Sequence, residues 1–347
     1  MDEQDQYPTD VPHAEFQLPR PAAKAPTIPI ATKFVQDYYP SVGISRSPGV
    51  PKAPIAQAPL SAPQARRVEQ MGAFKSAISP RDLIQVAGTP ACPVILDVRR
   101  REVFEQAEDM IPTATWQDHR KPVVPAGIGP VVVYCVYGHQ VGQAAAALLR
   151  SAGVNARYLE GGIEAYRAVG GPLIRKGVLP ERPGGVASHW VTRERPKIDR
   201  IACPWFIRRF VDRNAAIHFV ESEWVREAAA ELDAIPFDVP DVEFSHIGEL
   251  CSFDAFLDRF GVNDPALRHM AVIIRGADTG HPELAPQAPG LLAMSLGLSA
   301  LYADDLAMMD TGFALYDSLY AWCWYAAAET HGWPPAPASK RTSEAVQ

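Results

Sequence analysis

The sequence predicts an α/β domain, a mainly parallel sheet flanked by helices, followed by a second domain that is mostly α-helical. Short apolar runs alternate with a helical segment over residues 93–159, which is typical of parallel sheets. Beyond a stretch rich in Pro and Gly, helix-start signals replace these runs. At 347 residues, the chain is long enough for two domains that each bury a core.

The expected boundaries place the α/β domain at 76–176, a Pro- and Gly-rich linker at 177–187 and the helical domain at 188–330. Residues 1–75 are expected to form a disordered tail, because 12 of the 33 prolines lie in the first 70 residues. A short docking motif around residues 34–39 is the alternative. A second disordered tail is expected at 331–347.

The expected strands of the α/β domain are the apolar runs at 93–98, 130–134 and 156–159. A helix is expected over 141–151, where Ala and Leu recur at helical spacing. The domain begins with a short helix that Ser79 caps.

Six helices are expected in the second domain. Asp199, Ser222, Ser252 and Asp264 are the expected caps of the first four. The ranges are 200–211, 222–232, 252–260, 265–275, 290–298 and 304–328. Aromatic residues of the last helix, such as Trp322, are expected to anchor the core or a homodimer interface.

Composition argues against several classes of function. No apolar run approaches the roughly 20 residues of a membrane-spanning helix, and the first residues are acidic where a secretory signal is basic. We therefore expect a cytoplasmic protein without a membrane partner. Five cysteines without regular spacing predict no disulfide framework. Residues 186–330 carry 11 Lys and Arg against 22 Asp and Glu, so nucleic acid is not an expected partner.

The segment VVVYCVYGHQV, residues 131–141, places Cys135 at the end of a buried strand and just before a helix. Loop amides and the helix N-terminus direct positive dipole ends toward such a sulfur. They favour the thiolate, which is the nucleophilic form. Gly138 lets the backbone turn around the sulfur without a Cβ clash. Cys135 is therefore the candidate nucleophile.

Four ordered motifs make residues 76–175 resemble single-domain rhodaneses. They are Leu96-Asp97-Val98-Arg99, Ile111-Pro112-Thr113-Ala114, the Cys135 loop, and Leu159-Glu160-Gly161-Gly162-Ile163 with Gly170-Gly171-Pro172. The resemblance implies a sulfurtransferase that needs no cofactor. Cys135 would accept sulfur from a small sulfane-sulfur donor as a persulfide and pass it to a thiol or cyanide. The amides of the substrate-binding loop would hold the persulfide, and that loop comprises Val136, Tyr137, Gly138, His139 and Gln140.

The resemblance gives Asp97 and Arg99 a structural role, supporting loops near the site. The length of the cysteine loop favours sulfur transfer over the oxyanion chemistry of related phosphatases. The loop departs from many family members because it lacks Arg and Lys, so we expect a persulfide or polysulfide donor rather than thiosulfate. A catalytically idle domain, with Cys135 as a structural thiol, is the alternative.

The second domain resembles the C-terminal domain of the ChrB chromate-resistance family over about residues 188–328. Three blocks carry the resemblance, Trp190 to Trp205, Pro236 to Phe253 and Ile274 to Gly280. A basic cluster within the first block is a candidate oxyanion site or a solvated surface with salt bridges. Its candidate ligands are Arg193, Arg195 and Arg200.

His246 and Cys251 are separated by a short loop, and imidazole and thiolate are both good ligands for zinc or a similar divalent metal. Further ligands would have to complete that site, and the candidates are Asp238, Glu249, Asp278 and Cys203. A helix-capping loop with a buried Cys and a hydrogen-bonded His is the alternative. We thus predict a sulfurtransferase linked to chromate or oxidant resistance, the alternative being a non-catalytic sensor that responds to an oxyanion or a metal.

Overall fold

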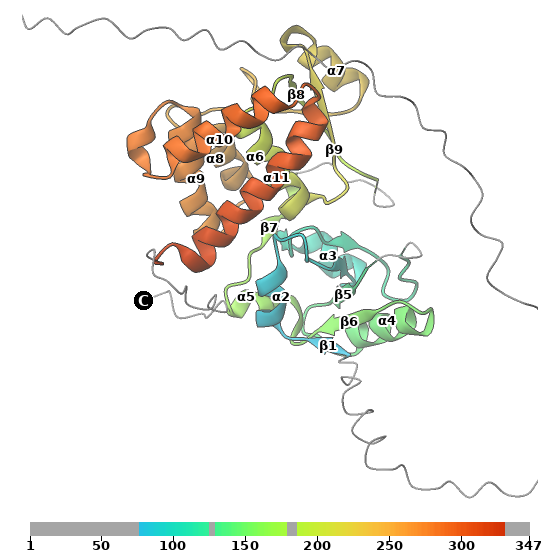
Figure 1. Cartoon of the computed structure of the whole chain (residues 1–347). Helices are drawn as coiled ribbons and strands as arrows, with labels where there is room; N and C mark the ends of the chain where they lie inside the picture. The colour runs from blue at the N-terminus through green and yellow to red at the C-terminus, as the bar shows by residue number, and fades with distance from the viewer. Residues whose placement is uncertain (1–75, 125–128, 179–185, 330–347) are drawn as a thin grey trace, which may run out of the picture. The chain divides into compact units, whose positions relative to one another are not determined.

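The computed structural model describes residues 76–124, 129–178 and 186–329 (Figure 1). The predicted tails at 1–75 and 331–347 lie outside the described residues, as does most of the predicted linker. Within the described part of the chain, no helix is long and apolar enough to cross a bilayer.

A five-stranded sheet forms the first domain, with strand order β1-β6-β5-β2-β4 and every neighbouring pair parallel. The strands are β1 (Ala77–Ile78), β2 (Val94–Asp97), β4 (Thr115–Trp116), β5 (Val131–Tyr134) and β6 (Ala156–Leu159). A small antiparallel pair joins β3 (Asp109–Met110) to β7 (Ile174–Arg175). The predicted α/β class, and its parallel sheet, are confirmed. All four residues of β5 are buried, because this strand is the centre of the sheet.

Helices flank the sheet on both faces. They are α2 (Pro80–Val86), α3 (Arg101–Gln106), α4 (Gln140–Ser151) and α5 (Gly162–Ala168), followed by the short helix η1 (Lys176–Val178). Val132 and Tyr134 belong to the core beneath α2 and α5, whereas Val131, Val133 and Cys135 belong to the core beneath α4. Successive side chains of a strand point to opposite faces, so this alternation directs Cys135 toward α4.

The second domain is mostly helical, as predicted. Its helices are α6 (Asp199–Phe206), η3 (Ile207–Val211), η4 (Ser222–Trp224), α7 (Val225–Glu231), α8 (Ser252–Arg259), α9 (Pro265–Asp278), η5 (Pro282–Leu284), α10 (Ala288–Leu301), α11 (Asp305–Ala321) and η6 (Trp322–Ala326). The second domain also contains a parallel three-stranded sheet of order β10-β8-β9, which was not predicted from the sequence. Its strands are β8 (His189–Arg193), β9 (Ala216–Val220) and β10 (Ile235–Pro236).

Three of the predicted helix caps are wrong. The predicted cap Ser222 is the first residue of η4, and Glu221 is the cap. The cap of α6 is Ile198, so Asp199 is the first residue of that helix and its side chain is free for other contacts. The cap of α8 is Cys251, which forms a capping box with Asp254, and Ser252 follows it inside the helix. The predicted caps Ser79 and Asp264 are confirmed by their hydrogen bonds to backbone N–H groups.

Candidate functional site

Cys135 directly follows β5 and lies four positions before His139, the N-cap residue of α4. The residue is 6% exposed. A Cβ added at Gly142, in the first turn of α4, would lie 3.2 Å from the Cys135 Sγ. The thiol therefore packs against the N-terminal end of α4, where the helix dipole favours negative charge.

The peptide units after Cys135 have a defined orientation. The Cys135 carbonyl accepts the Ile163 N–H at 3.0 Å, and the Val136 carbonyl accepts the Glu164 N–H at 3.2 Å. In a trans peptide the N–H points opposite to the preceding C=O, so the N–H groups of Val136 and Tyr137 point away from α5. Among the described residues, no acceptor is recorded for any amide N–H from 136 to 140. These amides are available to an anion.

Glycines allow this close approach of the loop to α5. Gly161 and Gly162 have φ of 66° and 61°, and Gly138 has φ of 68°. A Cβ at Gly138 would lie 2.6 Å from the Gly161 nitrogen, and a Cβ at Gly162 would lie 2.3 Å from the Cys135 carbonyl oxygen. Only residues without a Cβ fit these positions. The Gly-Gly pair of the sequence motif therefore shapes the cysteine loop.

Asp97 and Arg99 form a buried ion pair beside the loop, with 2.8 Å between Arg99 Nε and Asp97 Oδ2. Tyr134, which sequence analysis did not single out, donates its hydroxyl to the same Oδ2 at 2.7 Å. The Val98 N–H in turn donates to the Tyr134 carbonyl. This network fixes the end of β5 one residue before Cys135.

The outer part of the loop faces solvent. Tyr137 is 61% exposed, and His139 and Gln140 are also exposed. The His139 side chain makes no capping hydrogen bond to α4. The Gln143 side chain donates to the Gly138 carbonyl at 3.0 Å and holds the loop on the helix. A small molecule that approaches the loop meets these exposed residues first.

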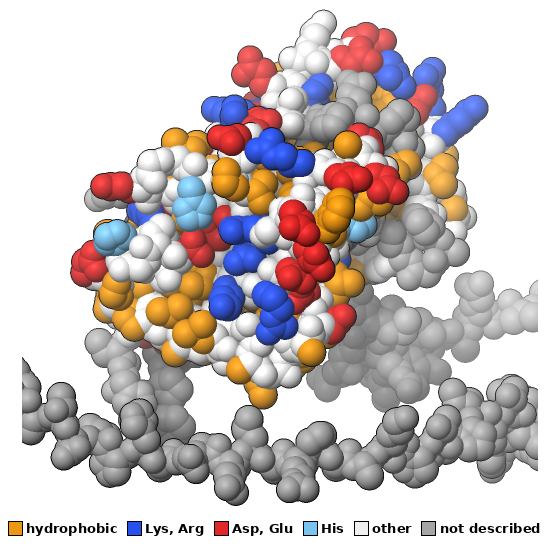
Figure 2. Space-filling view, turned by 90° about the horizontal axis from the view of Figure 1, so that it is seen from above, with side chains coloured by type: hydrophobic (Ala, Val, Ile, Leu, Met, Phe, Trp, Pro, Cys, Tyr) orange, Lys and Arg blue, Asp and Glu red, His pale blue; other side chains and the backbone are white. Residues whose placement is uncertain are grey.

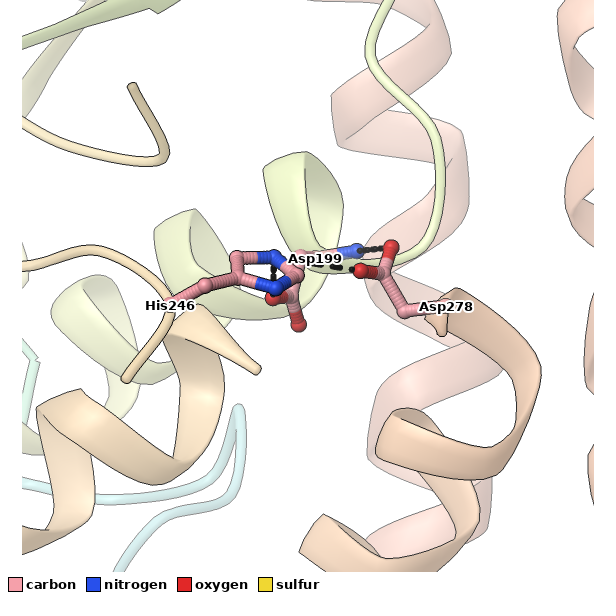
Figure 3. A group of neighbouring side chains, drawn as sticks. All are labelled: Asp199, His246 and Asp278. Atoms are coloured by element: carbon pink, nitrogen blue, oxygen red, sulfur yellow. Dashed lines mark hydrogen bonds and ion pairs between the residues drawn. The ribbon is translucent and has the colours of Figure 1, made fainter. Parts of the chain in front are cut away.

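In the second domain, His246 lies beside Asp199 and Asp278 (Figure 3). His246 Nε2 lies 3.5 Å from Asp199 Oδ2 and 3.3 Å from Asp278 Oδ2. One ligand atom from each residue lies within 4.8 Å of the others, which is the spacing of a metal-binding group. His246 was predicted as a candidate ligand, whereas Asp199 was predicted only as a helix cap.

A third carboxylate, Asp238, lies 3.3 Å from His246 Nε2. Arg193 and Arg200 contact its Oδ2 at 3.1 and 3.2 Å, and the Ser252 hydroxyl donates to its Oδ1 at 2.8 Å. Although burial opposes the charge, hydrogen bonds from His246 and Ser252 lower the pKa of Asp238. Asp238 is therefore a fully partnered anion.

The pKa values of the other two carboxylates are raised, whereas that of Asp238 is lowered. Burial, with the charges of Asp278 and Asp238, holds the pKa of Asp199 well above its usual range. Burial and the Asp238 charge also raise the pKa of Asp278. The hydrogen bond to Asp238 raises the pKa of His246. Two of the three acids are thus poorly stabilised as anions by their protein surroundings.

The remaining candidate residues of this domain have structural partners. Arg195 donates to the carbonyls of Ser299 and Tyr302 at the end of α10, so its guanidinium stabilises a helix C-terminus. Basic and acidic side chains adjoin each other on the face shown in Figure 2. The Cys251 Sγ lies 3.4 Å from Asp254 Oδ2 within the capping box, and it is not part of the group with His246.

Comparison with known proteins matches each domain separately. Residues 79–169 match the family model of the rhodanese-like domain, and residues 190–323 match that of the ChrB C-terminal domain. Protein ChrB of Cupriavidus metallidurans is 34% identical over 155 residues, which cover 41% of this chain and 46% of that protein. The matched region thus spans about half of the relative's length.

Two solved structures are similar to part of the chain. A rhodanese-related protein of Thermoplasma volcanium is 22% identical, with a TM-score of 0.25 over 28% of this chain and 95% of that one. A Bacillus halodurans protein is 24% identical, with a TM-score of 0.28 over 32% of this chain and 85% of that one.

Proposed function

We propose that this chain, which joins a rhodanese-like domain to a ChrB C-terminal domain, transfers sulfane sulfur through a persulfide on Cys135. The observation that carries the proposal is the row of amide N–H groups from 136 to 140 without described acceptors, beside a thiol at the start of α4. Such amides stabilise a thiolate and the terminal anionic sulfur of a persulfide.

The reaction has two displacement steps. The Cys135 thiolate attacks the outer sulfur of a donor persulfide, a new S–S bond forms, and the donor S–S bond breaks to release the donor thiolate. An acceptor thiolate then attacks the outer sulfur, and the electron pair of that S–S bond returns to Cys135. With cyanide as acceptor, the product is thiocyanate. No external oxidant or reductant is needed, because the sulfane sulfur moves without a net redox change.

The loop chemistry favours a persulfide or polysulfide donor. The loop from Cys135 to Gln140 contains no Lys or Arg, so it lacks a permanent charge for a dianion such as thiosulfate. His139 is exposed in the loop but, unlike Lys or Arg, it is not a permanent cation. We therefore propose that a persulfide donor supports faster turnover than thiosulfate.

The test is a steady-state assay of the full chain with glutathione persulfide or thiosulfate as donor and cyanide as acceptor. Thiocyanate should form with the wild type and with Cys92→Ser, a control thiol of the same domain, but not with Cys135→Ser. Mass spectrometry without acceptor should find one extra sulfur atom on the peptide that contains Cys135. Equal turnover by Cys135→Ser, or the extra sulfur on another cysteine, would contradict the proposal.

We further propose that the ChrB C-terminal domain links this activity to chromate or oxidant resistance, because chromate oxidises the thiols that sulfane sulfur helps to restore.

A second candidate function is a non-catalytic oxyanion sensor. It is favoured by Arg193 and Arg200, which converge on Asp238 and are 37% and 19% exposed. Calorimetry with chromate and sulfate separates the two, since a sensor binds tightly without turnover, and absence of heat for both anions argues against it.

A further inference from the structure

Three potential ligands in the second domain come from elements far apart in the sequence. Asp199 begins α6, His246 lies in the loop before α8, and Asp278 ends α9. Their side chains point toward one another in Figure 3. Core packing holds α6 and α9, and the core residues Phe244 and Cys251 anchor the two ends of the loop that carries His246, so the group is preformed.

The protein alone leaves this group incompletely satisfied. His246 Nε2 carries at most one proton, yet three carboxylates lie within 3.5 Å of it. Asp199 is 1% exposed, its Oδ2 accepts the Ser252 N–H at 2.6 Å, and its Oδ1 has no hydrogen-bond partner among the described residues. A buried carboxylate oxygen without a partner is costly, and a cation is the ligand that satisfies it.

The position of Asp278 at the end of α9 independently favours a bound cation. This residue is the last of α9, a helix of 14 residues, so its carboxylate lies at the negative end of the helix dipole. A negative side chain is unfavourable there, whereas a cation is stabilised. An ion bound by Asp278 would therefore interact favourably with the helix as well as with the side chain.

Asp238 has a different role from the other two acids. Its two oxygens are occupied by Ser252, Arg193 and Arg200. Asp238 Oδ1 lies 3.3 Å from Nε2 and holds the His246 ring beside the group until an ion takes over that nitrogen, so Asp238 is a positioning residue of the metal-free site. Such partners orient a ligand and tune its affinity for metal.

We propose that Asp199, His246 and Asp278 bind a single divalent transition-metal ion of the first row. One imidazole and two carboxylates form a mixed nitrogen and oxygen donor set suited to zinc, iron or manganese. His246 is 39% exposed and Asp278 is 19% exposed, so one side of the ion faces solvent and keeps a coordination position open. The ion does not contact Cys251, and the proposal is independent of sulfur transfer at Cys135.

The affinity test uses the full chain after removal of metal with a chelator. Titration with Co²⁺ should give visible absorption bands and one equivalent of bound metal. His246→Gln and Asp278→Asn should each weaken binding by about 100-fold or more, and Ser252→Ala, which loosens Asp238, by about tenfold. His281→Gln is the matched control, because His281 is exposed and pairs with Glu283 outside the group. Its affinity should equal that of the wild type.

A second measurement avoids variants altogether. X-ray absorption of the wild type loaded with Zn²⁺ should show nitrogen and oxygen ligands, including one imidazole. A sulfur ligand at about 2.3 Å would overturn the proposal in favour of a site containing Cys251. Failure of Co²⁺, Mn²⁺ and Zn²⁺ to bind the folded wild type more tightly than about 1 mM would also overturn it and leave the group as a closed ion-pair network. Neither result bears on turnover at Cys135.

Discussion

Gly162→Ala tests whether the approach of α5 to the cysteine loop shapes the site. Gly162 has φ of 61°. It lies so close to the cysteine loop that an added Cβ would be 2.3 Å from the Cys135 carbonyl oxygen and 2.4 Å from the Val136 carbonyl oxygen. Either α5 or the loop must move. Gly170→Ala is the matched control, because Gly170 has φ of 78° but nothing within 4 Å of the added Cβ.

Both variants place a Cβ in a left-handed backbone conformation, but only Gly162→Ala also creates a steric overlap. A left-handed conformation costs a residue with a Cβ about 1–2 kcal/mol, which is the whole expected effect at Gly170. Overpacking against the two carbonyl oxygens adds about 1–3 kcal/mol at Gly162. We therefore expect a loss of about 2–5 kcal/mol for Gly162→Ala. Displacement of the loop amides should also slow sulfur transfer by roughly tenfold or more.

Hydrogen exchange at increasing urea concentration measures the free energy of opening for peptides from 129–178, separately from the second domain. Sulfur transfer is measured on the same samples with a persulfide donor and cyanide. The reasoning is refuted if Gly162→Ala destabilises these peptides no more than Gly170→Ala and leaves turnover unchanged. The contact between α5 and the loop would then have no role in shaping the site.

Three further predictions concern single side chains. Tyr134→Phe removes the hydroxyl that donates to Asp97, so the first domain should lose about 1–3 kcal/mol of stability in urea unfolding, and no loss would contradict the network. Gly142→Ala should change the free energy of unfolding by less than about 1 kcal/mol, since Ala is favourable in a helix. It should nevertheless slow sulfur transfer roughly tenfold, because the added methyl group would lie 3.2 Å from the Cys135 Sγ. Burial raises the pKa of Cys323 to about 12, so alkylation there should increase about tenfold per pH unit between pH 8 and 10, whereas a plateau near pH 9 would contradict this.

Local sequence patterns determined much of the first domain. The apolar runs at 93–98, 130–134 and 156–159 became β2, β5 and β6, because buried parallel strands need continuous apolar residues. The cap Ser79 of the first domain and the cap Asp264 of the second were also predicted correctly, because a cap side chain bonds to an N–H only two or three residues away. Every neighbouring pair of strands in this sheet is parallel, as predicted.

Tertiary structure decided which distant groups meet. Asp199 was predicted as a helix cap, and His246 was paired with nearby Cys251, because sequence reasoning ranks neighbours along the chain. In the fold, Cys251 serves as the cap of α8, while α6 and the end of α9 bring Asp199 and Asp278 to His246. The small sheet around β8 was missed because the sequence of β8, HWVTR, has neither a continuous apolar run nor a regular alternation of apolar and polar residues. Spacing along a sequence encodes local hydrogen bonds, whereas the meeting of distant side chains depends on how helices pack around a shared core.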